Sequence, residues 1–371
     1  MVRHQTLNLA FRWFESSYPC HLKLILIEIE KKLPAVEIVG DFLYVGVFKL
    51  IEKILSTAIN LKASDIHLTA GQKVFIRANG ELLQFGEILT SSDLQKILAE
   101  IVPPRLAENL NRNLAVDFSC KKFERRFRVN VYYQRNFPAV AIRLIAEKIP
   151  TLEEIGAPKV LKKFLNTTQG LILVTGRTGS GKSTTIAAFL NELCKIRPCH
   201  LLTLEDPIEF EYTTEKSFIS QRELGQDFLN FADAVRTSLR EMPDVLLVGE
   251  IRDAETMHAA LEASAAGILV LATLHTKSAA ETAMRVETMF PLVQRDAIRD
   301  LFADEFSAII SQQLLKTSNG RKCAAEVLIA NPATRSLIRQ GKYVQLPNVM
   351  MSNSAEGMQT MDAALKKLGI Q

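Results

Sequence analysis

Residues 176–183 have the sequence Gly176-Arg177-Thr178-Gly179-Ser180-Gly181-Lys182-Ser183, which fits the phosphate-binding pattern G-x-x-x-x-G-K-[ST]. Glycines in this pattern let backbone N–H groups turn inward around a phosphate chain without a clash from a Cβ atom. The pattern lies between an apolar run, Leu171–Thr175, and a segment with helical spacing, Lys182–Ile196. A buried strand that leads into a helix N-terminus is the setting in which such a loop binds phosphate. We therefore expect a nucleotide site here.

The loop also indicates which cofactors to expect. Lys182 can reach the β- and γ-phosphates, and the hydroxyl of Ser183 can bind Mg²⁺. The expected cofactors are ATP and Mg²⁺. The residues predicted to bind the nucleotide are Gly176, Thr178, Gly179, Ser180, Gly181, Lys182, Ser183 and Thr184.

Composition excludes several other classes of protein. The 371 residues suggest two domains, and 47% hydrophobic with 23% charged residues is ordinary for a globular chain. A net charge of +4 without a separate basic tract gives no nucleic-acid footprint. Five scattered cysteines without Cys-x-x-Cys spacing indicate neither a disulfide framework nor a zinc site. No apolar run has the length of a membrane span, and the N-terminus lacks the order of a signal peptide. We expect a cytoplasmic protein that is peripheral at the cytoplasmic membrane.

The chain divides into segments of different pattern. Residues 1–47 have no clean periodicity and are left as an unassigned extension. Residues 48–148 combine helical spacing, alternating strands and a hairpin signal at Asn79-Gly80, which predicts a small α+β domain. Proline and glycine mark a linker over 149–160. Residues 161–371 are predicted to form the nucleotide domain with additional C-terminal helices.

The nucleotide domain is predicted to be of the α/β class. Apolar runs at Leu171–Thr175, Leu201–Glu205, Val245–Gly249 and Ile268–Thr273 alternate with helical segments. Such alternation implies a parallel sheet covered on both faces, with ligands at the carboxyl ends of its strands. Gln294–Leu315 and Pro332–Gln340 are predicted to be helices beyond this core.

Two strands end in acidic residues that suit nucleotide hydrolysis. Asp244–Glu250 is an apolar strand that ends in Glu250, the layout of a Walker B segment with glycine in place of the usual aspartate. Glu250 is therefore a candidate ligand of Mg²⁺, although a surface acid after a core strand would look the same. Glu205 ends a second strand and can activate water, while Asp206-Pro207 is equally compatible with a simple turn.

His275 and four arginines complete the set of candidates. His275 follows the fourth apolar strand, where it can sense the γ-phosphate or serve only a structural role. Arg128 and Arg143 lie opposite the apolar faces of alternating strands, and Arg236 and Arg240 are four apart, as on one helix face. Any of these arginines can supply transition-state charge across a subunit boundary. From the residues alone no choice among them is possible.

Several of these segments occur together in one family. The chain resembles the type IV pilus retraction ATPases (PilT-like) among the secretion-type hexameric ATPases. The resemblance covers about 48–371 and rests on the loop at 176–183 and on five further stretches. These are Leu204–Phe210 for the Asp box, Val248–Asp253 for an atypical Walker B, Ala272–Thr276 for the His box, and Ser64–Leu68 with Arg126–Asn130 for a PAS-like N-terminal domain.

This resemblance implies a RecA-like nucleotide domain, a hexameric ring and hydrolysis of Mg–ATP coupled to pilus retraction and twitching motility. It implies that Glu205 is the catalytic glutamate, that Glu250 acts at Mg²⁺ and water, and that His275 senses the nucleotide. It implies that Arg128, Arg143, Arg236 and Arg240 supply charge around the nucleotide, some of it across a subunit boundary. An inner-membrane pilus platform protein and a paralogous motor ATPase are the implied partners.

Departures from the family pattern leave alternatives open. Arg177 stands where the family has proline. Residues 333–340 correspond to the retraction motif A-I-R-N-L-I-R-E, from which Thr334, Ser336 and Gln340 differ. An accessory retraction ATPase and a type II secretion or pilus assembly ATPase therefore remain alternatives, as do a non-catalytic ATP-binding adaptor and a nucleic-acid motor. Residues 1–47 have no family counterpart, and a start of translation near Val45 or Val47 would explain them.

Overall fold

The computed structural model describes residues 39–78, 80–145, 148–212, 216–317 and 320–369. Most of the unassigned extension at 1–47, and Asn79 of the predicted hairpin turn, lie outside these ranges. The chain forms two compact units. The first contains residues up to 116 together with 131–141, and the second contains 117–130 and 142–371. The domain boundaries expected at 148 and 161 stay predictions.

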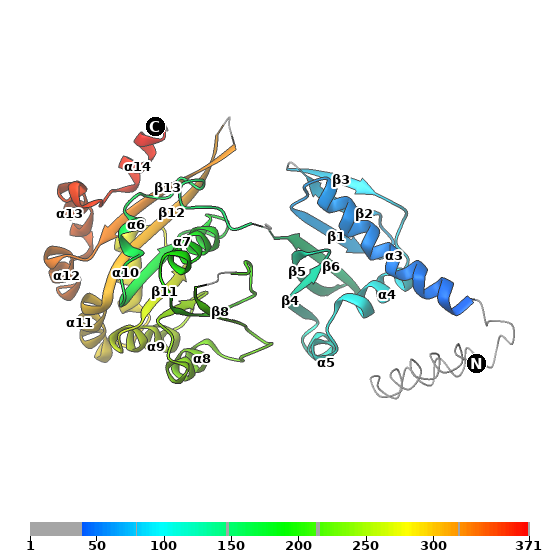
Figure 1. Ribbon diagram of the computed structural model, residues 1–371, viewed down its shortest axis with the longest axis horizontal. Helices are drawn as coiled ribbons and strands as arrows, with labels where there is room; N and C mark the ends of the chain where they lie inside the picture. The colour runs from blue at the N-terminus through cyan, green and yellow to red at the C-terminus, as the bar shows by residue number, and fades with distance from the viewer. Residues whose placement is uncertain (1–38, 79, 146–147, 213–215, 318–319, 370–371) are drawn as a thin grey trace. The chain divides into compact units, whose positions relative to one another are not determined.

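A six-stranded sheet in the order β3-β2-β1-β6-β5-β4 carries the N-terminal elements (Figure 1). Buried and partly exposed residues alternate along its strands. In β5, Phe127, Val129 and Val131 are buried, and the residues between them are partly exposed. The expected hairpin forms, with Ala78 opposite Glu81. The elements are α3 (Val39–Asn60), β1 (Asp65–Thr69), β2 (Val74–Ala78), β3 (Glu81–Phe85), α4 (Ser91–Ile101), α5 (Pro104–Asn113), β4 (Ala115–Lys122), β5 (Arg125–Gln134) and β6 (Phe137–Leu144).

The second sheet has seven strands in the order β13-β12-β7-β11-β10-β8-β9. All neighbours are parallel except β12 and β13, which form an antiparallel hairpin. The strands are β7 (Gly170–Thr175), β8 (His200–Glu205), β9 (Phe218–Glu223), β10 (Val245–Val248), β11 (Leu269–Leu274), β12 (Phe306–Thr317) and β13 (Gly320–Ile329). The α/β fold predicted for this domain is confirmed, and its parallel strands bring their carboxyl ends to one edge.

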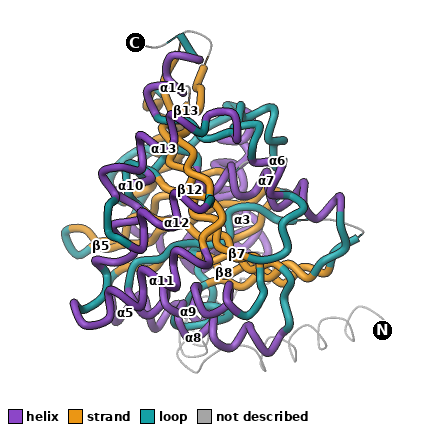
Figure 2. Tube along the Cα trace, turned by 90° about the vertical axis from the view of Figure 1, so that its left-hand side faces the viewer, coloured by secondary structure: helices purple, strands orange, loops and turns teal. Residues whose placement is uncertain are grey.

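Helices cover both faces of this sheet because successive strand residues point in opposite directions. On one face, Ile172 and Val174 of β7 pack in a core cluster with residues of α7 (Lys182–Ile196). On the other face, Leu171 and Leu173 belong to a cluster with α8 (Phe231–Ser238), α9 (Ala254–Ala265), α10 (Ala279–Thr288) and α11 (Arg295–Glu305). The remaining helices are α6 (Leu161–Phe164), α12 (Pro332–Arg339), α13 (Leu346–Ser352) and α14 (Met361–Lys367), with short 3₁₀ turns at Leu239–Glu241, Leu292–Gln294, Tyr343–Gln345 and Ser354–Glu356. Figure 2 shows β12 and β13 leading toward α13 and α14, which contact β13.

Two secondary-structure predictions are wrong in part. The helix expected over Gln294–Leu315 ends at Glu305, and β12 begins at Phe306. The apolar run after Glu305 is buried between neighbouring strands, so pairing with β7 and β13 outweighs its helical spacing. Arg236 and Arg240 do not share one α-helix, because α8 ends at Ser238 and Arg240 lies in the following 3₁₀ turn. The helix predicted over Pro332–Gln340 is confirmed as α12.

Candidate nucleotide site

The carboxyl ends of four adjacent strands meet at the candidate site. In spatial order, β7 leads into Gly176, β11 into His275, β10 into Glu250, and β8 ends at Glu205. Parallel pairing sets this alignment, since Leu274 lies opposite Thr175 and Val248 lies opposite both Ala272 and Leu204. Residues from four separate stretches of sequence therefore meet at one edge of the sheet, where ligands bind in open α/β sheets.

The phosphate loop has the backbone that its glycines permit. Gly176 has φ of 143°, and a Cβ atom there would meet the carbonyl oxygen of Gln312 at 2.4 Å. Gly181 is the left-handed N-cap of α7, and Lys182 is the first residue of the helix. The hydroxyl of Ser180 is buried in the loop without a hydrogen-bond partner in the described part of the chain. A glycine cradle with an orphaned donor at a helix N-terminus fits the phosphate groups of a nucleotide.

Lys182 lies across the loop that precedes it. Its Nζ donates to the carbonyl of Gly176 at 2.8 Å and to that of Arg177 at 3.3 Å. Burial lowers the pKa of Lys182, and the carboxylates of Glu250 and Glu209 act in the opposite direction. An ammonium held by carbonyl oxygens at a helix N-terminus gains strongly from a phosphate, and the phosphate-binding role of Lys182 stays a prediction.

Glu250 is the centre of a small charged cluster. One oxygen lies 3.0 Å from Nε2 of His275, and the other accepts a hydrogen bond of 2.8 Å from Arg252. Burial acts to raise the pKa of Glu250, but the hydrogen bond and the charge of Arg252, together with the nearby Lys182, bring it below the ordinary value. The carboxylate is therefore ionised at neutral pH and suited to a cation.

His275 lies between this carboxylate and the phosphate-binding lysine. Its Nδ1 is 3.5 Å from Nζ of Lys182, while Nε2 faces Glu250. A single proton on Nε2 satisfies both contacts, because Nε2 then donates to the carboxylate and Nδ1 accepts from the ammonium. The side chain of His275 remains 43% exposed, so a phosphate can reach it.

The glycine at the usual aspartate position of the Walker B segment has a steric explanation. A Cβ atom on Gly249 would lie 2.9 Å from the carbonyl oxygen of Leu204 and 3.2 Å from Cα of Glu205. The N–H of Gly249 also donates to the Leu204 carbonyl at 2.7 Å. Strands β10 and β8 thus approach too closely at their ends for a side chain, and the first carboxylate after β10 is that of Glu250.

Glu205 is the buried acid of the site, with 9% of its surface exposed. Its Oε1 accepts from the hydroxyl of Thr203 at 2.7 Å and from the amide of Gln221 at 3.2 Å. Burial raises the pKa of Glu205 to about 7, against the opposing effect of these hydrogen bonds. A carboxyl group that titrates near neutral pH can take a proton from water and release it, which is what a general base needs.

The four predicted arginines are not brought together. Arg128 forms an ion pair of 2.6 Å with Asp117 on the neighbouring strand, and Arg236 contacts Asp233 at 3.2 Å one helical turn away. Arg143 is exposed at the end of β6. Arg240 is exposed in its 3₁₀ turn and makes no ion pair within the described ranges. Their predicted roles stay predictions.

Two residues of the site escaped the sequence prediction. Arg252 fixes Glu250 and also approaches Asp206 at 3.7 Å, joining the Walker B and Asp-box segments. Gln221 holds Glu205 from β9, a strand that was not predicted because its residues are mostly half-buried and polar. The spacing of Arg252 two residues after Glu250 was visible, but nothing in it distinguished an ion pair from a solvated charge.

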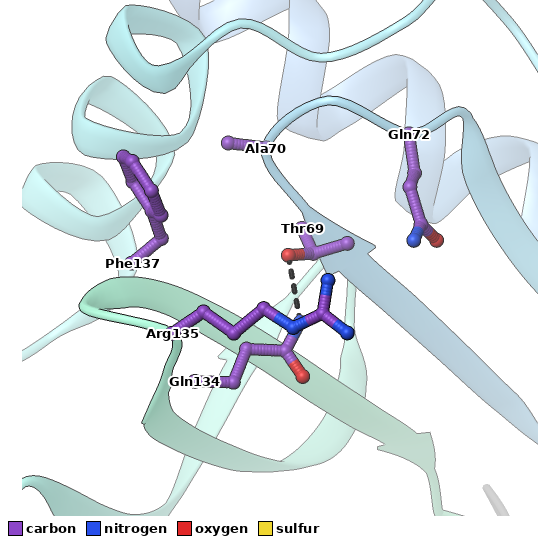
Figure 3. A pocket seen from close by; sticks show the side chains of 6 residues that line it. All are labelled: Thr69, Ala70, Gln72, Gln134, Arg135 and Phe137. Carbon is purple, nitrogen blue, oxygen red and sulfur yellow. Dashed lines mark hydrogen bonds between the residues drawn. The ribbon is translucent and has the colours of Figure 1, made fainter.

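A surface cavity elsewhere includes none of these residues. It has a volume of about 280 Å³ and lies in the first unit, where the amide of Gln134 donates to the hydroxyl of Thr69 at 2.9 Å (Figure 3). Its other lining residues are Ala70, Gln72, Arg135 and Phe137.

Comparison with known proteins identifies the family of the chain. The family model of the Type II/IV secretion system protein matches residues 45–356. The chain is 42% identical over 318 residues to the twitching motility protein of Neisseria gonorrhoeae, covering 83% of this chain and 85% of that one. It is 40% identical over 324 residues to the type IV pilus retraction ATPase PilT of Pseudomonas aeruginosa, covering 86% and 93%.

A crystal structure of the pilus retraction motor PilT with bound ADP superposes with a TM-score of 0.76 at 40% identity, over 85% of this chain and 95% of that one. The chain belongs to the Type II/IV secretion system protein family. Within that family it is an ATP-hydrolysing enzyme of the pilus-retraction type. The family and the RecA-like fold indicated by the sequence motifs are thereby confirmed.

Proposed function

We propose that the chain is the subunit of a hexameric ring that hydrolyses Mg–ATP to retract a type IV pilus through an inner-membrane platform protein. The observation that carries this proposal is the row of side chains Lys182, His275 and Glu250, linked at 3.5 Å and 3.0 Å across three strand ends. Such a row can register the presence or loss of a γ-phosphate. Among the described helices, none combines the length and apolar character that crossing a bilayer requires. We place the ring in the cytoplasm, peripheral at the membrane.

Each acid has its own part in the proposed hydrolysis. Glu205 takes the proton from the attacking water, and Glu250 orients that water and, together with Ser183, would hold the cation. The described residues contain no group of three or more His, Cys, Asp or Glu side chains that could hold a metal. One carboxylate and one exposed hydroxyl fit Mg²⁺, which uses few protein ligands and completes its shell with phosphate and water. Bound there, the cation would neutralise charge on the phosphates.

His275 is proposed as the residue that reports hydrolysis. It contacts Lys182 on one side and Glu250 on the other, so a change in either partner alters its hydrogen bonds. The arginines Arg128, Arg143, Arg236 and Arg240 are proposed to bring positive charge to the nucleotide, some from a neighbouring subunit. Charge supplied in this way is worth roughly 10³–10⁵ in rate where it operates.

Helix α12 contains the segment that differs from the retraction motif. Arg335 donates to the carbonyls of Ala303 and Asp304 at the end of α11, and its guanidinium lies 5.4 Å from the ring centroid of Phe306. Arg339 contacts the carboxylate of Asp304. The two arginines that the chain shares with the motif thus attach α12 to the last turn of α11.

The departures from the motif have local partners. Thr334 forms a capping box with Asn331 at the start of α12. The amide of Gln340 donates to the hydroxyl of Ser336 at 2.9 Å. Helix α12 is therefore stabilised by its own polar contacts, and the motif's helix is retained although three of its side chains are replaced.

The proposal is tested in a strain from which the gene is deleted. Loss of a retraction motor leaves cells with surface pili but without twitching motility. Complementation with the wild-type chain restores motility, and complementation with Lys182→Ala does not. Deleted cells that lack pili would contradict retraction and indicate assembly or secretion. Unchanged motility in the presence of a second motor would assign the chain to an accessory role.

A further inference from the structure

A chain of buried hydroxyl groups lies directly behind the nucleotide site. The hydroxyl oxygens of Thr276 and Thr282 are 2.6 Å apart, and that of Thr282 lies 3.3 Å from the hydroxyl of Thr175. Thr175 in turn lies 2.6 Å from the hydroxyl of Ser311. All four side chains are at least 95% buried. The chain joins the loop of His275 to the last residue of β7, immediately before Gly176, and to β12.

The hydroxyl of Thr282 lies at the centre of this chain. It has one proton, which it can donate to the carbonyl of Ser278 at 2.7 Å or to the hydroxyl of Thr175 at 3.3 Å, and it then accepts from Thr276. Thr175 can in turn donate to Ser311. A buried hydrogen-bonded network of this kind favours one arrangement of the segments that it joins.

The loop that carries His275 is short and is held from inside. Only residues 275–278 separate β11 from α10. Thr276 is buried, whereas the side chain of its neighbour His275 is exposed toward Lys182 and Glu250. The start of α10 is fixed separately by the buried carboxylate of Glu326, which accepts from the N–H of Ala279 at 2.6 Å. The hydroxyl chain is therefore a buried side-chain link between the His275 loop and the base of the phosphate loop, in addition to the exposed contact of His275 with Lys182.

We propose that Thr282 and Thr276 are positioning residues, which hold His275 in register with the phosphate loop through Thr175. This inference rests on the proposed role of His275 in hydrolysis. Without the hydroxyl of Thr282, the imidazole of His275 would still be present but would no longer be held against both Lys182 and Glu250. A misplacement of this kind lowers turnover more than nucleotide binding, because the phosphate loop and Lys182 remain in place.

The test uses the full-length chain with Thr282→Val, which removes the hydroxyl and keeps the shape. We expect kcat for ATP to fall about tenfold, the effect of losing one buried hydrogen bond, while the Kd of a non-hydrolysable ATP analogue stays within twofold. Thr282→Ser restores kcat to within about threefold, and Thr276→Val lowers it as Thr282→Val does. The matched control is Thr288→Val on the same helix, where the side chain is exposed and donates only to Arg285 within that helix.

A double-mutant comparison separates this inference from the role of His275. In a His275→Ala background, Thr282→Val is expected to change kcat less than twofold, because it acts through His275. If Thr282→Val lowers kcat equally in both backgrounds, or if Thr282→Ser behaves like Thr282→Val, the positioning role is overturned. If His275→Ala alone leaves kcat unchanged, the proposed role of His275 fails instead. If Thr282→Val does not fold, the positioning role is tested with Thr276→Val and Thr282→Ser, each in the wild-type and in the His275→Ala protein.

Discussion

Replacing Glu205 by glutamine is expected to stabilise the protein at alkaline pH while it strongly slows hydrolysis. The buried carboxyl has a pKa of about 7 against an ordinary value of 4.5. The unfolded chain therefore ionises Glu205 at lower pH than the folded chain does. Folding is penalised as pH rises from about 4.5 to about 7, and the penalty is constant above that window. Below it, the carboxyl is neutral in both states and no penalty exists.

The size of the effect follows from the same two values. Each pKa unit corresponds to about 1.4 kcal/mol, so the penalty reaches roughly 3 kcal/mol above pH 7. Glutamine does not titrate, and its amide oxygen can still accept from Thr203. Any change in hydrogen bonding adds a constant to the difference between the two proteins, whereas the ionisation of Glu205 adds a part that depends on pH.

The assay is urea unfolding of both proteins at pH 5, 6, 7 and 8. We expect the stability advantage of Glu205→Gln to increase by about 2–3 kcal/mol between pH 5 and pH 8. In the wild type, kcat should rise about tenfold from pH 6 to pH 8, since only about a tenth of a base with this pKa is ionised at pH 6. A pH-independent difference in stability would refute the raised pKa, and a flat kcat over this range would refute Glu205 as the base.

Three further changes test other parts of the site. Lys182→Ala should weaken binding of an ATP analogue at least tenfold by equilibrium titration, and unchanged affinity would contradict the phosphate contact. Gly249→Ala should lower the unfolding free energy by about 1–3 kcal/mol and reduce kcat, because the new methyl group meets the backbone of β8; wild-type stability would show that the strands can separate. Arg335→Ala should leave ATP hydrolysis within threefold but lower the melting temperature by several degrees, and a normal melting temperature would contradict the attachment of α12 to α11.

The strands that position the site could be predicted because each one is an uninterrupted apolar run next to a loop with polar side chains. Glu205, Glu250 and His275 all follow such runs, and parallel pairing is enough to bring strand ends together. The distances among them could not be predicted, since they depend on the order β7-β11-β10-β8, which differs from the order in the sequence.

The features that the sequence predicted wrongly or did not reveal have local physical causes. Gln294–Leu315 combines helical spacing with β-branched residues, and pairing with the neighbouring strands β7 and β13 decides where α11 ends. Strand β9 has little apolar character because it lies at the edge of the sheet. The hydroxyl chain through Thr282 involves common residues at distant positions, and no spacing in the sequence marks it.

The effect of Glu205→Gln on ATP binding and hydrolysis at pH 8 tests the role of Glu205 as the general base most directly. Binding of radiolabelled ATP and release of inorganic phosphate are measured on the same preparation, beside the wild type. The account predicts ATP binding within twofold of the wild type and phosphate release lower by a factor of about 10²–10⁴. Phosphate release at the wild-type rate would contradict it.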